Sequence, residues 1–372
     1  MTVACAIPAP PPLRSLYLFA ACLAVYFCLP ENASARDLIY AFPLLFIAES
    51  LASGRADLHR GAAFIGLCFL ALWLPLSLPN GSVGVHEALF VAASLLVLTL
   101  HFETPHRFPI ALLIAGGGVA LVTWLRSAAG LFAGFDLLRS AQTAGESSLG
   151  LALPLVAIHA WASGRRRVFL VSLLLSVLMF KRIALLALAI VIVLEVLQSG
   201  RFPRLGAVLR AALIAAVFLC GLNSTLVYEH LSALAQSLFG LSLSPDEVSS
   251  GRYFATLLFQ DWLGAHASIF SSLVGHGPGF STRFLTESAD LAQKHFPLLH
   301  NDILRLHSDY GFVGLVGAFW AFQRMARAAP AARGIATYTA LIFLTDNVLT
   351  YFYYWVIAIA LLRVPDEDPR SA

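Results

Sequence analysis

The chain has 372 residues, of which 59% are hydrophobic and 12% charged, and its mean hydropathy is +0.80. Because charged residues make up about a quarter of a soluble domain, this composition excludes an ordinary soluble protein and predicts an all-α, polytopic integral membrane protein. The formal net charge of +3 is uninformative, since orientation depends on where Arg and Lys fall between the spans. Five separate cysteines without a CxxC pair argue against a disulfide framework or a zinc site.

At about 20 apolar residues per crossing, the sequence predicts about 12 transmembrane helices. The apolar runs cover 15–30, 38–52, 61–78, 85–101, 108–125, 148–163, 166–180, 183–198, 207–223, 306–323, 335–347 and 348–363. With both termini in the cytoplasm, the inner connections carry most of the arginines, as the positive-inside rule requires. Residues 1–165 hold the first half of these spans. Residues 166–372 hold the second half and a long periplasmic loop, 223–305, before the tenth helix.

The N-terminus has a second interpretation. Arg14, the apolar run Ser15–Leu29 and the small residues Ala33–Ala35 are also typical of a signal peptide with its cleavage site. Because further spans follow at once, we favour an uncleaved first helix. Both interpretations place residues 31–37 outside the membrane.

Lys181 and Arg182 form a cationic pair that the topology places on the outer side. The flanking apolar runs, Val168–Phe180 and Ile183–Leu197, are shorter than the about 20 residues of a full span. The pair is therefore expected below the membrane surface, where charge is costly unless it lines a cavity or meets a partner. A recessed arginine suits a lipid phosphate, because its planar fork offers several donors. Alternatively, the pair snorkels to the headgroups, or 168–198 is one long tilted helix.

The periplasmic loop contains recognisable local signals. Leucines at helical spacing predict an amphipathic helix on the membrane face, at Leu231, Leu234, Leu238 and Leu241. Ser244–Glu247 has the pattern of a capping box that begins a second helix. Gly275, Gly277 and Gly279 allow either a plain tight turn or close approach of the backbone to a ligand.

Six further ionisable residues lie in or near the predicted spans: Glu49, His86, Glu87, His159, Glu195 and Asp346. Intramembrane ionisable residues are functional candidates by default. No spacing among these six indicates a proton relay.

The end of the loop combines a helix start with a histidine. Asn301 is a good N-cap for a helix in which Asp302, Arg305 and Asp309 share a face and can neutralise one another. His300 falls just before this helix, at the mouth of the predicted cavity. A neutral imidazole there could accept a proton from a sugar hydroxyl, or it could simply hydrogen-bond the loop. His307 lies below His300 on the helix.

The order of several short motifs resembles the O-antigen ligase and Wzy-type polysaccharide polymerase superfamily. The resemblance is strongest over about 180–325, while residues 1–165 match only as hydrophobic spans. Its motifs are Arg182 at a helix start, Ser250-Gly251-Arg252 followed by Trp262, Gly275–Gly279, His300-Asn301-Asp302, Tyr310-Gly311 and Gly314-Leu315.

The resemblance implies a glycosyltransferase on the periplasmic face of the bacterial inner membrane. It would transfer a glycan from undecaprenyl pyrophosphate to a sugar hydroxyl during surface polysaccharide synthesis. Arg182 and Arg252 would hold the donor diphosphate, and His300 would activate the acceptor. The remaining substrate-binding residues would be Lys181, Gly275, Gly277, Gly279, Asn301, Arg305 and His307. The loop lacks a DxD-like acidic pair, so we expect no metal and no cofactor. The expected partners are lipids and glycans, without nucleic acid.

Several acceptors stay open. A polymerase is slightly favoured over a ligase that uses lipid A-core, because HNDILRL followed by DYG resembles the polymerase branch. A protein O-oligosaccharyltransferase usually has additional C-terminal sequence. A transporter or flippase would instead show broken helices and repeated halves around a midplane site, which the sequence does not indicate.

Overall fold

The structure, a computed structural model, describes residues 14–28, 45, 48–49, 52, 60–99, 108–131, 148–179, 181–249, 251–288 and 299–363. These residues form helices and no strand, which confirms the all-α prediction. The predicted span 38–52 and the possible cleavage site at Ala33–Ala35 fall largely or wholly outside the described residues.

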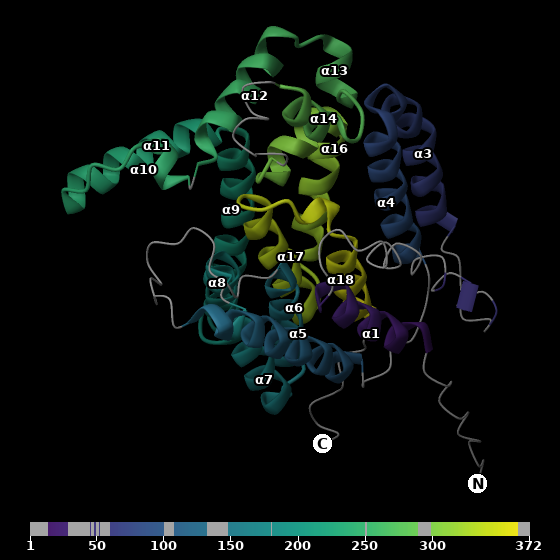
Figure 1. Cartoon of the computed structure of the whole chain (residues 1–372), viewed down its shortest axis with the longest axis vertical. Coiled ribbons are helices and arrows are strands. Elements are labelled where there is room, and N and C mark those ends of the chain that lie inside the picture. Colours follow the sequence, from purple (N-terminus) through teal and green to yellow (C-terminus); the bar gives the residue numbers. More distant parts are fainter. Residues whose placement is uncertain are drawn as a thin grey trace.

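The helices follow the predicted apolar runs along the chain (Figure 1). Their bounds are α1 (Arg14–Cys28), α3 (Arg60–Ser77), α4 (Gly81–Thr99), α5 (Phe108–Leu131), α6 (Leu153–Ala162), α7 (Arg166–Leu178), α8 (Arg182–Ser199), α9 (Pro203–Leu222), α16 (Asp302–Met325), α17 (Pro330–Phe343) and α18 (Phe352–Arg363). Short 3₁₀ turns precede α4, α6 and α18, at Leu78–Asn80, Ser148–Leu151 and Val348–Thr350.

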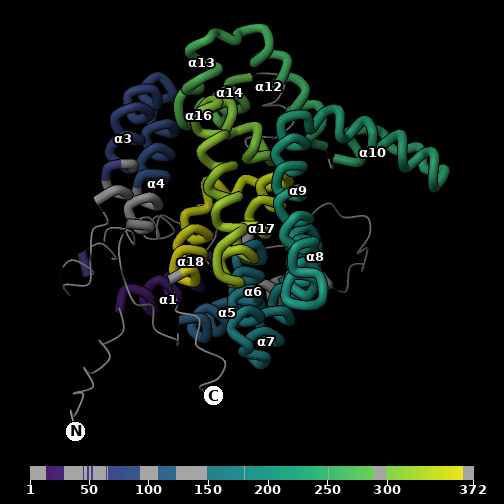
Figure 2. The backbone as a smooth tube through the Cα atoms, turned by 180° about the vertical axis from the view of Figure 1, so that it is seen from behind, coloured from purple at the N-terminus to yellow at the C-terminus, as the bar shows by residue number. Residues whose placement is uncertain are grey.

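Among the described residues, three stretches are long and apolar enough to cross a membrane, namely Gly66–Ala92, Arg182–Ser199 and Pro203–Leu222. The first of them includes the turn between α3 and α4, which pack side by side as a hairpin. Helices α1 and α5 run across the lower end of the bundle rather than along it (Figures 1 and 2). The described helices thus fit an all-α protein with membrane-spanning helices, but not the predicted count of about 12 crossings or their alternating topology.

Two expectations about residues 168–198 need correction. This segment is not one long helix, because α7 ends at Leu178 and α8 begins at Arg182. The run after Arg182 is not too short to cross, because the helix continues beyond Leu197 to Ser199 and reaches 18 residues. Of these two helices, only α7, with 13 residues, is too short for a full span.

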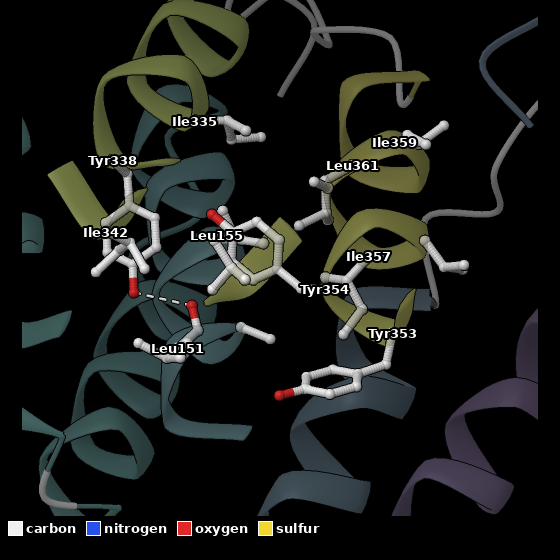
Figure 3. Packing of buried hydrophobic residues seen from close by; sticks show 14 of the residues in the cluster. Leu151, Leu155, Ile335, Tyr338, Ile342, Tyr353, Tyr354, Ile357, Ile359 and Leu361 are labelled. Carbon is white, nitrogen blue, oxygen red and sulfur yellow. Dashed lines mark hydrogen bonds between the residues drawn. The ribbon is translucent and has the colours of Figure 1, made fainter. Parts of the chain in front are cut away.

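The core lies where α6 packs against α17 and α18 (Figure 3). Helix α6 is buried continuously from Leu153 to Ala160, as expected for a helix that is apolar all round. Two buried tyrosines find partners for their hydroxyls. Tyr338 donates to the Leu151 carbonyl at 2.8 Å, and Tyr354 pairs with Thr339 at 2.7 Å.

A buried ionic cluster joins α8, α9 and α17. The Glu195 carboxylate lies 2.7 Å from Nη2 of the fully buried Arg210 and 2.7 Å from Nη2 of Arg333. Arg210 also donates to Thr337 at 3.2 Å. This arrangement satisfies the intramembrane charge of Glu195 by pairing within the bundle.

The segment predicted as the long loop folds into short helices, namely α10 (Ser224–Phe239), α11 (Pro245–Val248), α12 (Tyr253–Ala265), α13 (Ile269–Val274) and α14 (Phe280–Glu287). Of these, α10 and α11 project to the side and the others lie at the upper end of the bundle (Figures 1 and 2). Two local predictions are confirmed. The leucine-rich segment is helix α10, although Leu241 lies beyond its end. The Ser244 side chain and Glu247 form a reciprocal capping box.

Helix α16 begins at the predicted N-cap but is less regular than predicted. Asn301 caps it by accepting hydrogen bonds from the backbone of Ile303 and Leu304, both at 3.1 Å. At Gly311 the helix breaks, with φ +66° and ψ −168°. A glycine is needed there because other residues rarely adopt this conformation.

Candidate active site

Three ionisable side chains from distant parts of the chain meet at the end of α17. Asp346 lies in the turn after this helix, with its side chain almost fully buried. Lys181, at the start of α8, places Nζ 3.2 Å from Oδ2 of Asp346. His300, just before α16, places Nδ1 3.7 Å from Oδ1 of Asp346. The buried carboxylate therefore has a cation on one side and an imidazole on the other.

Hydrogen bonds fix this turn and the 3₁₀ turn that follows it. The Asn347 N–H donates to Oδ1 of Asp346 at 2.9 Å, and the Tyr351 hydroxyl donates to Oδ1 of Asn347 at 3.0 Å. In the 3₁₀ turn that follows, Val348–Thr350, the Leu349 N–H donates to Oδ2 of Asp302 at 2.7 Å. Asp302 thus links the start of α16 to the turn that presents Asp346.

Arg252 reaches the same turn from the loop. It precedes α12, and its Nη1 donates to the Thr345 carbonyl at 2.8 Å, directly beside Asp346. A guanidinium has five N–H donors, so this bond leaves others for a ligand. Burial raises the pKa of the Tyr228 hydroxyl, and the positive charge of Arg252 partly opposes that shift.

Arg182 follows Lys181 directly, and its side chain is exposed. Lys181 itself points to Asp346, so its charge balances the buried carboxylate. Because Asp346 balances Lys181, the excess positive charge at this end of the bundle comes from Arg182 and Arg252. Such a site suits an anionic ligand with several oxygen acceptors.

Among the other residues expected to bind substrate, Asn301 and Arg305 have protein partners. The buried Asn301 amide donates to the Gly221 carbonyl at 2.7 Å and to Ser224 at 3.1 Å, which ties the start of α16 to the junction of α9 and α10. Asn301 therefore has a structural role in the fold. Of the other two residues, Arg305 is fully buried and His307 is half-buried.

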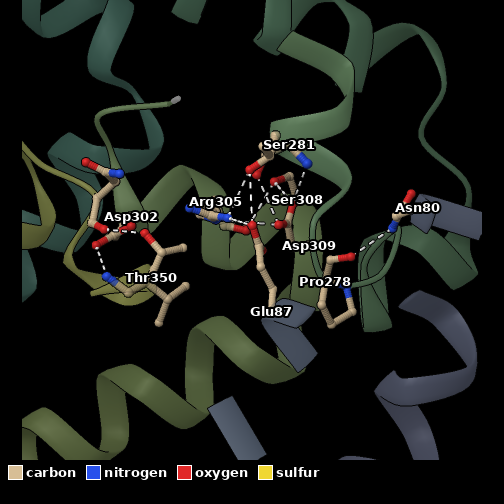
Figure 4. Close-up of polar contacts among 12 residues, drawn as sticks. Asn80, Glu87, Pro278, Ser281, Asp302, Arg305, Ser308, Asp309 and Thr350 are labelled. Atoms are coloured by element: carbon tan, nitrogen blue, oxygen red, sulfur yellow. Dashed lines mark hydrogen bonds and ion pairs between the residues drawn. The ribbon is translucent and has the colours of Figure 1, made fainter. Parts of the chain in front are cut away.

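Arg305 is the centre of a buried ionic cluster that joins α4, α14 and α16 (Figure 4). It forms an ion pair with Glu87, its Nε lies 3.6 Å from Oδ2 of Asp309, and it donates to Thr282 at 3.1 Å. Asp309 also accepts hydrogen bonds from the backbone and hydroxyl of Ser281, both at 3.0 Å. The predicted neutralisation is confirmed for Arg305 and Asp309, whereas Asp302 bonds to Leu349 instead.

The glycines of the Gly275–Gly279 segment pack against the protein itself. The backbone N–H groups of His276 and Gly277 donate to the carbonyls of Ser308 and Asp309, at 2.8 and 3.0 Å. These carbonyls lie just before the break at Gly311, so the loop takes the place of helical donors. On the other side, the Asn80 amide donates to the carbonyls of this segment, including Pro278 at 3.0 Å. The close approach is to α16 and the α3–α4 turn.

The imidazole of His276 lies among aromatic side chains of the loop. Its ring stacks on Phe280 with centroids 4.5 Å apart and meets Trp262 edge-on at 5.3 Å. Burial lowers the pKa of His276, and the nearby His266 and His307 lower it further. His276 is therefore neutral at neutral pH and serves as a packing residue.

We expect Gly277→Ala to destabilise the protein by roughly 2–5 kcal/mol, from about 1–2 for the positive φ and about 1–3 for overpacking. Gly277 has φ +92°, and a Cβ there would lie 2.0 Å from the Leu76 carbonyl oxygen. Gly264→Ala is the matched control, because its Cβ would meet nothing within 4 Å. Thermal unfolding in detergent should show a lower midpoint for Gly277→Ala alone. Equal midpoints would contradict this packing.

The sequence did not indicate that Asp346 and Glu87 are ion-pair partners of the predicted site residues. It singled out both only as ionisable residues near the predicted spans. Asp346 pairs with Lys181 and His300, and Glu87 pairs with Arg305. The available signal was the cost of an intramembrane charge, which requires a partner without specifying which one.

Within the described segments, no group of three or more His, Cys, Asp or Glu side chains could hold a metal ion. The fold and the site define an all-α protein with membrane-spanning helices and basic residues gathered around one buried carboxylate. No protein-family model matches the chain, and no curated protein matches it.

Proposed function

We propose that the protein is a metal-independent glycosyltransferase on the periplasmic face of the bacterial inner membrane. Its donor is a glycan on undecaprenyl pyrophosphate, and its acceptor is a sugar hydroxyl in surface polysaccharide. One observation carries the proposal. Lys181, Arg252 and His300, which lie far apart in the sequence, meet at the turn that holds Asp346.

The basic residues suit the donor diphosphate. Arg252 is held by the Thr345 carbonyl, and the exposed Arg182 begins the neighbouring helix α8. When the glycosyl C–O bond breaks, its electron pair goes to the diphosphate, which departs with increased negative charge. Preorganised positive charge at the leaving group is commonly the largest catalytic contribution.

His300 suits the acceptor. Its Nδ1 faces Asp346, which leaves Nε2 as the ring nitrogen to take the proton of the attacking hydroxyl. As the acceptor oxygen bonds to the anomeric carbon, the proton passes to His300. The negative charge of Asp346 then stabilises the imidazolium, as a carboxylate does in other histidine-based sites.

The cytoplasmic placement of both termini and the identity of the acceptor belong to the proposal too. We favour a polymerase slightly over a ligase that uses lipid A-core. Gel analysis of glycans from a deletion strain separates the two. Single repeat units on lipid A-core would indicate a lost polymerase, whereas full-length chains on the lipid carrier would indicate a lost ligase.

A transporter or flippase is the second candidate, and the break in α16 favours it. Broken helices in transporters expose backbone groups that bind ions or substrate. Here, the N–H groups of His276 and Gly277 occupy the carbonyls of Ser308 and Asp309 before the break. These two carbonyls are therefore already satisfied within the protein, which argues against their use as a transport site.

Arg252→Ala tests the diphosphate role. We expect transfer to slow by about 10- to 150-fold, which corresponds to roughly 1.5–3 kcal/mol for a hydrogen bond to a charged group. The assay follows transfer from purified lipid-linked donor by the reconstituted protein. Arg327→Ala, at an exposed position after α16, is the control and should keep normal activity. Normal transfer by Arg252→Ala would refute the role, and substrate flux that survives both Arg252→Ala and His300→Ala would favour transport.

A further inference from the structure

In the first half of helix α10, the polar face contacts protein. Thr225 donates to the Gln260 side chain at 2.7 Å, and the Tyr253 hydroxyl donates to Glu229 at 2.6 Å. Ser232 donates to the Leu243 carbonyl of the segment that folds back along the helix.

The apolar face of α10 is the exposed one. Leu231, Leu234 and Leu238 recur at helical spacing and are 44%, 49% and 65% exposed. A surface helix in water turns such a stripe toward the core. A contiguous exposed apolar face indicates a partner that covers it.

The position of α10 indicates which partner. It follows the membrane-spanning helix α9 with only Asn223 between them, and it projects sideways from the upper end of α9 (Figures 1 and 2). A helix that leaves a membrane-crossing helix sideways lies along the membrane surface. Exposed leucines continue across the junction, from Leu219 in α9 to Leu226 in α10.

The charge of α10 and of the segments beside it indicates that the helix contacts lipid acyl chains rather than anionic headgroups. The sequence has no Lys or Arg between Arg210 and Arg252, while Glu229, Asp246 and Glu247 are acidic. Electrostatic attraction to anionic lipid therefore cannot supply the binding energy. Burial of leucine side chains is left as the driving force.

We infer that α10 is an interfacial helix whose Leu231, Leu234 and Leu238 insert into the outer leaflet, at the headgroup–acyl boundary about 5–10 Å deep. Because Tyr253 bonds to Glu229, the insertion also sets the depth of the start of α12 and of the adjacent Arg252. The inference takes the side of the membrane from the proposed topology, but it does not depend on the proposed transfer reaction.

Spin labelling of the full-length protein in phosphatidylcholine nanodiscs tests this inference. The five native cysteines are replaced by alanine, and single labels are introduced as Leu234→Cys, Leu238→Cys and, as the control, Gln236→Cys. Gln236 is also exposed but lies about 200° around the helix from Leu234. Collision rates with oxygen, which concentrates in lipid, are compared with those of a water-soluble nickel chelate.

We expect the labels at 234 and 238 to favour oxygen over nickel several-fold more than the label at 236. Equal nickel access at 234 and 236 would overturn the inference, because α10 would then face water on both sides. Shielding of 234 from both reagents would also overturn it, in favour of a contact with a second copy or another protein. Addition of phosphatidylglycerol should leave the depth unchanged, and a deeper position would refute insertion driven by leucines alone.

Discussion

Replacing His300 by alanine should slow the proposed glycan transfer by about 10²–10⁴-fold, the usual contribution of a general base. The side chain is 30% exposed and lies in the loop before α16, so its removal leaves no buried cavity. The initial rate at saturating donor measures the effect. Elution of the variant as a single species in detergent confirms that it folds. An unchanged rate would exclude His300 as the base.

Asp346 sharpens this experiment because it acts through His300. If the carboxylate positions the imidazole, Asp346→Asn should slow transfer, and the double variant should be no slower than His300→Ala alone. Such non-additivity identifies residues that work as a unit. Two losses that simply add would indicate a separate structural role for Asp346. Asp246→Asn, at an exposed position in the loop, is the matched control.

Replacing Arg305 by leucine should destabilise the protein by about 3–5 kcal/mol, the cost of breaking a buried ion pair. The substitution removes the cation from Glu87 and Asp309, which are both buried. Thermal unfolding in detergent should show the loss. Arg204→Leu, at an exposed position in the first turn of α9, is the control and should change little.

A second substitution distinguishes lost charge balance from lost packing. Glu87→Gln combined with Arg305→Leu removes one unpaired carboxylate and should recover part of the stability. If Arg305→Leu is as stable as Arg204→Leu, the buried cluster does not hold the loop helix α14 to α16. No recovery in the double variant would attribute the loss to packing.

Local features were predictable from neighbouring residues. The capping box at Ser244 and Glu247 and the N-cap at Asn301 depend on groups within three residues of each other. The apolar runs predicted where helices lie, because each run satisfies its own backbone hydrogen bonds. Their orientation was not predictable, and α1 and α5 lie across the bundle where two crossings were expected.

Composition and periodicity determined that this chain is helical and has membrane-spanning helices. Only the tertiary structure decided the pairings, namely Asp346 with Lys181 and His300, and Glu87 with Arg305. It also decided that Gly277 faces the α3–α4 turn. The physical reason is that a buried charge or a glycine without a Cβ requires a close partner, whereas the packing of distant helices selects which partner that is.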